Sequence, residues 1–144
     1  MIWFKEFTTE MLNDRPKNHI GALLGIQFTE IGDDYLCATM PVDERTHQPA
    51  GILHGGASVV LAETLGSIAS YMCIDPDKYI AVGLEVNANH LRPVSSGWVK
   101  GVCKPLHIGA KTQVWEIKMY TNKEKLNCIS RLTVAILPNP QSGK

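Results

Sequence analysis

The sequence has no excess charge of either sign and few aromatic side chains. Fourteen basic residues balance fourteen acidic ones, and Phe, Trp and Tyr together make up 7% of the 144 residues. A chain without net charge creates no broad field that attracts nucleic acid or an anionic membrane. Neither class of partner is therefore expected, although a local site for an anion is compatible with this composition.

No two cysteines have the spacing of a redox or zinc motif. Cys37, Cys73, Cys103 and Cys128 are far apart, and each lies in an apolar or strand-like segment. We therefore predict four reduced cysteines in the core. The first residues also lack the basic segment and long apolar run of a secretory signal. Together these features predict a cytoplasmic protein.

Motifs for metals and nucleotides are absent as well. The five histidines show no H-E-x-x-H or comparable spacing, and there is no P-loop, G-x-S-x-G or dinucleotide-binding fingerprint. We therefore expect no metal and no cofactor. A chain of 144 residues is long enough for one domain whose core needs neither a metal nor a disulfide.

Basic residues are also missing from the longest apolar segment, 53–73, which contains a single carboxylate, Glu63. The segment is long enough to span a bilayer, but its three glycines, several hydroxyls and central carboxylate oppose insertion. We interpret it as a helix in the core of a globular domain. Because an unpaired ionised carboxylate is costly to bury, Glu63 is predicted to line a cavity where its chemistry is used. The alternative is an ordinary exposed helix carboxylate.

Helical patterns, strands and one ordered loop surround this helix in the sequence. Helical patterns cover 9–13 and 19–24, and the loop covers 41–52. Alternating or apolar runs predict strands at 26–31, 35–42, 79–91, 98–106, 111–120 and 127–137.

Long antiparallel strands that follow one apolar helix predict an α+β fold in which a curved sheet wraps around the helix. We assign a single domain to residues 1–137 and expect the tail, 138–144, to fray. In the strand at 79–91, strict alternation predicts one face that carries Val82, Leu84, Val86, Ala88 and His90.

The start of the central helix, His54-Gly55-Gly56, is a candidate oxyanion site, because the first N–H groups of a helix lack internal acceptors. A plain glycine-rich helix start is the alternative. Gly55 could polarise a carbonyl that Glu63, or a water it activates, attacks. In a continuous helix the two residues are about 12 Å apart along the axis, too far for one reacting carbon. The spacing therefore predicts a dimer in which two antiparallel copies of the helix share a site.

Three polar residues are weaker candidates for the same site. Ser67 lies one helical turn after Glu63 and could bond the carboxylate or a thioester, or simply its own helix. Gln48 could position water or a carbonyl, or lie on the surface. His90 could contact substrate, or be an ordinary strand histidine.

These motifs, with several others, resemble those of the hotdog-fold acyl-CoA thioesterases over nearly the whole chain. The matching segments are IGDD at 31–34, ATMPVD at 38–43, HGGASVVLAE at 54–63, VGLEVNANH at 82–90, GVCKPLH at 101–107 and SRL at 130–132.

The resemblance implies that Glu63 is the nucleophile or general base and that the Gly55 N–H binds the oxyanion, with Gln48 and His54 placing the carbonyl. It implies hydrolysis of an acyl-CoA, with an aromatic acyl group, by dimers that share sites and pair into tetramers. The nucleotide of coenzyme A would lie against Arg92 and the turn at 106–110. The residues expected to contact the substrate are Ser67, Ile68, His90, Arg92, His107, Gly109 and Ala110.

Three other functions are left open by the sequence. A proofreading thioesterase would act on acyl groups attached to a carrier protein. A hotdog dehydratase would form an alkene without releasing thiol. A non-catalytic acyl-CoA-binding protein is the third alternative, but a binder would not need Glu63. The preferred acyl group, and the choice between the two roles of Glu63, also stay open.

Overall fold

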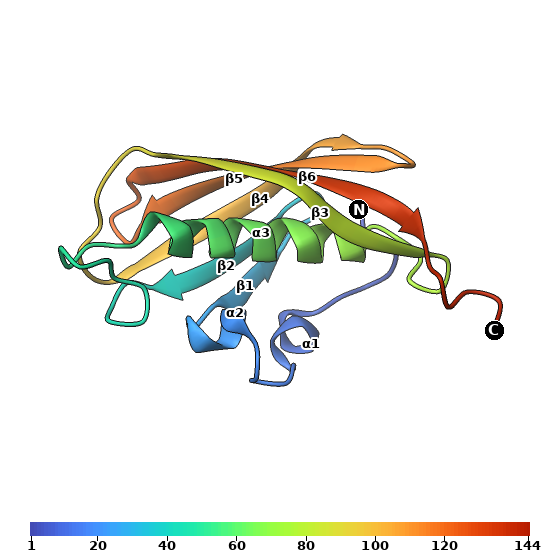
Figure 1. The fold of residues 1–144 in the computed structure, drawn as a ribbon, viewed down its shortest axis with the longest axis horizontal. Coiled ribbons are helices and arrows are strands. Elements are labelled where there is room, and N and C mark those ends of the chain that lie inside the picture. Colours follow the sequence, from blue (N-terminus) through green and yellow to red (C-terminus); the bar gives the residue numbers. More distant parts are fainter.

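The computed structural model describes residues 1–144 as a six-stranded antiparallel sheet curved around one long helix (Figure 1). The elements are α1 (Thr9–Asn13), α2 (Ile20–Leu23), β1 (Gln27–Ile31), β2 (Leu36–Pro41), α3 (Gly55–Met72), β3 (Tyr79–His90), β4 (Trp98–Ile108), β5 (Thr112–Thr121) and β6 (Leu126–Pro138). These elements confirm the predicted α+β fold.

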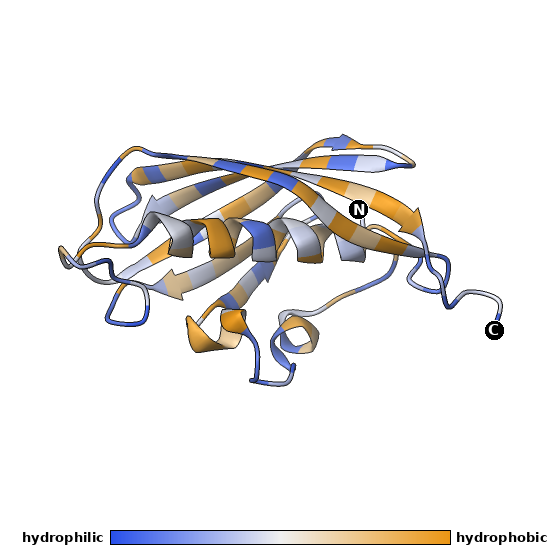
Figure 2. Cartoon of the chain, in the orientation of Figure 1, coloured by the Kyte–Doolittle hydropathy of each residue, from blue (hydrophilic) through white to orange (hydrophobic).

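The sheet has the strand order β1-β2-β4-β5-β6-β3, and every neighbouring pair is antiparallel. Polar and apolar residues alternate along several strands, which appears as blue and orange bands in Figure 2. The apolar face packs on α3 and forms the core, in which Leu65, Trp115 and Leu132 are fully buried. Burying a large apolar side chain contributes about 1.5–3 kcal/mol, so this shared face is the main source of stability.

One face of α3 is buried and the other is open. The buried residues are Ala57, Ser58, Leu61, Ala62, Leu65, Gly66, Ala69, Ser70 and Met72. On the opposite side, Gly56, Glu63 and Tyr71 are exposed. The sheet of the same chain therefore covers only one side of its central helix.

A bulge breaks the alternation predicted for β3. The pairing of β3 with β6 shifts between Gly83 and Glu85. Odd-numbered residues before the shift and even-numbered residues after it therefore point to the same face. Val82 and Leu84 are 41% and 61% exposed, whereas Val86 packs against the core. The prediction that all five alternating residues share one face was wrong, because a bulge inserts an extra residue.

The predicted domain end at residue 137 falls inside the last strand. Pro138 pairs with Tyr79 at the end of the β3–β6 ladder, and Asn139 donates its backbone N–H to Lys78 O at 2.7 Å. Successive N–H groups of a strand point to opposite sides, and Ile136 donates to Lys111 on the β5 side. An N–H at position 138 would point to that same side, beyond the first residue of β5, Thr112, so the missing N–H of Pro138 costs no ladder bond.

None of the helices combines the length and the apolar character needed to cross a bilayer. All four cysteines are free thiols, and three are fully buried. Cys73 is the exception, because it follows α3 and is only partly buried.

Candidate active site

Helix α3 starts with one occupied and one free backbone donor. His54 is the N-cap, and its Nδ1 accepts the Gly56 N–H at 2.8 Å. A neutral imidazole that accepts at Nδ1 carries its proton on Nε2, so His54 retains a donor. The Gly55 N–H has no acceptor in the chain, and it lies at the positive end of an 18-residue helix. This end can therefore stabilise a developing oxyanion.

The loop before α3 holds Gln48 in place. Its backbone N–H donates to Ile52 O at 2.8 Å, and its backbone oxygen accepts the Gly51 N–H at 2.9 Å. Its side-chain Oε1 accepts the Ala50 N–H. The amide nitrogen of Gln48 therefore remains free to donate to a carbonyl.

A cavity of about 330 Å³ lies at this end of α3 and contains four of the predicted site residues. They are Gln48, Gly55, His90 and Arg92. A Cβ at Gly55 would lie 2.8 Å from His90 Nε2, so the absence of a side chain is what admits the histidine ring. His54 does not border this cavity, although it caps the same helix.

Two buried polar residues that line the cavity were not predicted from the sequence. Ser58 is 1% exposed and lies in the first turn of α3, and Asn127 is 3% exposed and lies on β6. A serine near a helix start suggests capping rather than a site. For Asn127 a signal was present, because asparagine is uncommon in strands and this one lies between Leu126 and Cys128.

Glu63 is not buried within the chain. It is exposed on the open face of α3, so within a single chain the alternative of an exposed helix carboxylate holds. The physical reason is that the sheet covers only the opposite face of the helix. The carboxylate lies over β3, since a Cβ at Gly83 would be 2.9 Å from Glu63 Oε1. Gly83, also missed from the sequence, leaves room for this side chain.

The structure separates Glu63 from the donors at the helix start. Because α3 is continuous from Gly55 to Met72, Gly55 and Glu63, which are eight positions apart, are separated by about 12 Å along the axis. Neither Glu63 nor its neighbours Ser67 and Ile68 line the cavity that contains Gln48 and Gly55. Ser67 and Ile68 are both partly buried.

The hairpin residues that were predicted to contact the nucleotide lie at the other end of the sheet from Arg92. The hairpin between β4 and β5, which contains His107, Gly109 and Ala110, projects at the C-terminal end of α3, whereas the chain leaving β3 at Arg92 is at its N-terminal end (Figure 1). The pairing with β6 agrees: Thr112, next to the hairpin, pairs with Ala135 near the end of β6, whereas His90 pairs with Cys128 near its start. One chain therefore does not place the hairpin and Arg92 around one nucleotide.

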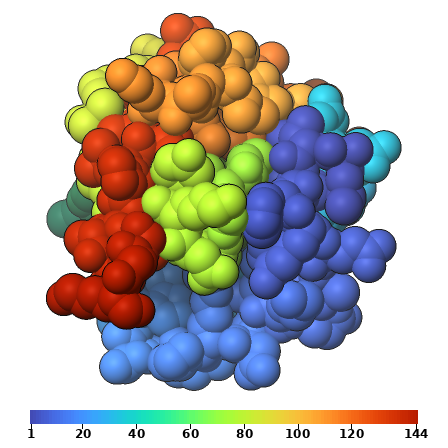
Figure 3. Space-filling view, turned by 90° about the vertical axis from the view of Figure 1, so that its right-hand side faces the viewer, coloured from blue at the N-terminus to red at the C-terminus, as the bar shows by residue number.

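Figure 3 views the hairpin end of the molecule. The hairpin, both chain termini and the end of α3 meet on this face. None of the residues that line the cavity around Gly55 belongs to these segments.

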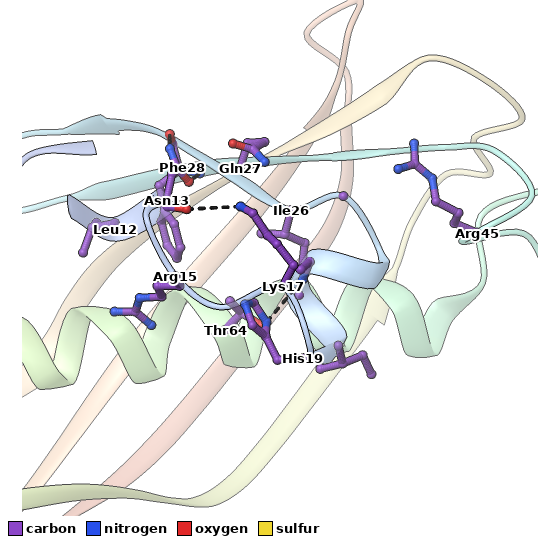
Figure 4. Close-up of a pocket in the computed structure, with 14 residues that line it drawn as sticks. Leu12, Asn13, Arg15, Lys17, His19, Ile26, Gln27, Phe28, Arg45 and Thr64 are labelled. Carbon is purple, nitrogen blue, oxygen red and sulfur yellow. Dashed lines mark hydrogen bonds between the residues drawn. The ribbon is translucent and has the colours of Figure 1, made fainter. Parts of the chain in front are cut away.

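A second cavity, of about 360 Å³, lies between α1, α2, β1 and α3 (Figure 4). It contains none of the predicted site residues. Its basic residues are Arg15, Lys17, His19 and Arg45. Lys17 Nζ donates to Asn13 O at 3.3 Å, and Arg45 forms a 2.7 Å ion pair with Asp43, so part of this charge is already paired.

Two pKa shifts bear on the chemistry of the chain. A hydrogen bond from the Arg45 side chain, aided by its backbone, lowers the pKa of the Asp43 carboxyl to about 2, so this carboxylate stays ionised into the acidic range. Burial raises the pKa of the Cys73 thiol to about 12, so this thiol is not a nucleophile at neutral pH. No group of three or more metal-ligating side chains is close enough to hold an ion.

Residues 50–128 match the profile of the thioesterase superfamily. The chain belongs to this family. It is 55% identical over 137 residues to 1,4-dihydroxy-2-naphthoyl-CoA hydrolase of Escherichia coli, which covers 95% of this chain and 100% of that protein. It is 51% identical over 137 residues to the proofreading thioesterase EntH of Cronobacter turicensis, with 95% and 99% coverage.

The family assignment extends to the structure. The crystal structure of a mutant of thioesterase PA1618 from Pseudomonas aeruginosa matches with a TM-score of 0.95 at 53% identity, over 96% of this chain and 100% of that one. Thioesterase HI1161 of Haemophilus influenzae matches with a TM-score of 0.94 at 46% identity over the full length of both chains. The fold is therefore the hotdog fold of this thioesterase superfamily, and the chain is a thioester hydrolase.

Proposed function

We propose that this thioesterase hydrolyses an acyl-CoA, preferably one with an aromatic acyl group, to a carboxylate and free coenzyme A. One observation carries the proposal. A single continuous helix has free donors for a carbonyl oxygen at its start and an exposed carboxylate about two turns later. The 55% identity to an enzyme named for an aromatic acyl-CoA supports the choice of acyl group.

In this proposal the Gly55 N–H and the Gln48 amide donate to the thioester oxygen as it becomes negative. Glu63 either removes a proton from an attacking water or attacks the carbonyl carbon itself to form a mixed anhydride, which water then cleaves. In both cases the carbon–sulfur bond breaks and the thiolate leaves and takes up a proton. Label found in Glu63 after a single turnover in labelled water would identify the anhydride route, because the general-base route never exchanges an oxygen of this carboxylate.

The proposed site is completed by Glu63 and Ser67 of a second copy of the chain. Strand β3 is an edge strand, and apart from β6 itself only the Ser130 side chain, also on β6, bonds the backbone between Ile80 and His90. Such an open edge favours strand addition. Two β3 strands paired antiparallel would bring two open faces of α3 together.

Further parts of the proposal rest on the family resemblance. Dimers would pair into tetramers, and the nucleotide of coenzyme A would contact Arg92. The hairpin with His107, Gly109 and Ala110 would join that contact only from another chain. The proposal also includes a cytosolic location, which is in line with the four free cysteines, and a step in menaquinone synthesis.

The test is a thiol-release assay over aromatic, short aliphatic and long aliphatic acyl-CoAs, with the same aromatic group also presented on a carrier protein. We expect kcat/KM to be about tenfold or more higher for the aromatic acyl-CoAs. A flat or long-chain profile would overturn the aromatic assignment. Faster cleavage from the carrier protein would favour the proofreading role, which the similarity to EntH also suggests.

A further inference from the structure

Asn127 carries one of two buried side-chain atoms that lack a hydrogen-bond partner. The residue is 3% exposed, yet its Oδ1 meets no donor; the other such atom is Ser70 Oγ. Buried polar atoms are nearly always paired, and an unpaired one at a cavity suggests a missing ligand or water. Asn127 lines the cavity that contains Gln48 and Gly55, whereas Ser70 does not.

The backbone of Asn127 is bonded to the chain that leaves β3, whereas the β5–β6 ladder skips this residue. Its backbone oxygen accepts the Leu91 N–H at 2.8 Å, and the neighbouring pair is His90 with Cys128. His90 contacts the start of α3 at Gly55, and Arg92 follows Leu91. Along the strands Asn127 is therefore level with Leu91, between His90, which is next to Gly55, and Arg92, and it lines the same cavity as Gly55 and Arg92.

Charge increases along the same direction. Arg92 also borders an adjoining crevice of about 360 Å³, whose other basic residues are Lys123 and Lys125 and which no carboxylate lines. The cavity thus contains neutral backbone and amide donors, the carboxamide residue Asn127 and Arg92, and the crevice that adjoins it at Arg92 adds two lysines.

The thiol half of an acyl-CoA has its polar groups in the same order. The thioester carbonyl is followed by sulfur, two methylene carbons and a secondary amide, and the phosphates come last. We propose, on the basis of the function proposed above, that Asn127 binds the first amide of the pantetheine arm. The Asn127 carboxamide can rotate about its soft Cβ–Cγ bond and so present either its oxygen or its nitrogen to the cavity. A secondary amide has both an N–H and a C=O and can therefore bond whichever of the two is presented. An aromatic acyl group, on the other side of the thioester, has no amide that could bond the Asn127 carboxamide.

The test compares Asn127→Leu and Asn127→Ser with the wild-type enzyme on three benzoyl thioesters. Benzoyl-CoA and benzoyl-N-acetylcysteamine contain the amide, and the pentanethiol ester replaces it with methylenes. We expect both variants to raise KM for the two amide substrates by about tenfold, with kcat nearly unchanged, because one hydrogen bond to a neutral group is lost. The pentanethiol ester should be unaffected. Ser70→Ala is the matched control and should change none of the three.

An equal rise of KM for all three esters would show a structural role and overturn the proposal, as would no change for any of them. Thermal unfolding of each variant checks that the fold is intact. If the wild type cleaves no thioester, the proposed function fails, but calorimetric binding of coenzyme A still tests Asn127. Weaker binding by the two Asn127 variants alone would support the contact, and equal binding by all proteins would overturn it.

Discussion

The two edges of the sheet are built differently. At the β1 edge, the Asn13 side chain accepts the Phe28 N–H at 2.9 Å and donates to Phe28 O at 2.8 Å, so a residue of α1 takes the place of a strand partner. At the β3 edge no element of the chain has this role, although β3 has 12 residues and β1 only five. Natural sheets protect their edges unless something pairs with them.

The same contrast holds for the two faces of α3. The face toward the sheet is closed by the core, whereas the face toward the β3 edge carries the exposed Glu63. The exposed carboxylate of this thioesterase therefore lies on the side that its own chain leaves open. In the proposed dimer, one partner would both pair with the open β3 edge and complete the site.

The largest effect is expected from the carboxylate on the open face. Glu63→Gln keeps the shape of the side chain but removes the base or nucleophile, so kcat should fall by about a thousandfold or more. Thiol release and thermal unfolding are measured on the same preparation. Turnover near the wild-type value would contradict the assignment.

The donors at the helix start should have smaller effects. Gln48→Ala and His54→Ala should each lower kcat/KM by roughly tenfold to a thousandfold, because these groups position or polarise the carbonyl. Steady-state thiol release measures the change. Treatment of the wild type with a chelator should leave activity intact; a loss restored by a divalent ion would show an unrecognised metal site.

A charge placed on the open edge tests the comparison directly. Leu84 on β3 is 61% exposed, and Leu84→Lys should dissociate the dimer and lower kcat/KM by about tenfold or more, since lysine blocks edge pairing. Leu23 on α2 is 67% exposed, so Leu23→Lys is the matched control. Analytical ultracentrifugation should show monomers only for Leu84→Lys. Equal behaviour of the two variants would argue against pairing through β3.

The smallest response is expected from the thiol at the end of α3. Burial raises the pKa of Cys73 to about 12, so its thiolate, the reactive form, is scarce until pH approaches that value. Alkylation by iodoacetamide at pH 8 should be about a thousandfold slower than for a free cysteine. Peptide mass spectrometry measures the labelling. Rapid labelling of the folded protein would show that the end of the helix opens.

Most elements of the fold could be predicted from the sequence, because long apolar and alternating segments such as the one at 111–120 have a clear period. The bulge between Gly83 and Glu85 could not, since its effect appears only when β3 is paired with β6. For the site, Gly55 could be proposed from the glycines at a helix start, and Glu63 from its being the lone carboxylate of an apolar segment. The exposure of Glu63 and the role of Asn127 depend on which surfaces the sheet covers, and no local pattern encodes that.

The shared site is tested most directly by mixing two inactive chains. Gln48→Ala and Glu63→Ala, each inactive alone, are denatured together and refolded, and thiol release is compared with that of the same chains mixed while folded. With random pairing about half of the dimers are mixed and half of their sites are intact, so up to roughly a quarter of wild-type activity should return in the refolded sample. No recovery, in a sample where mass spectrometry confirms mixed dimers, would place the whole site within one chain and contradict the division along α3.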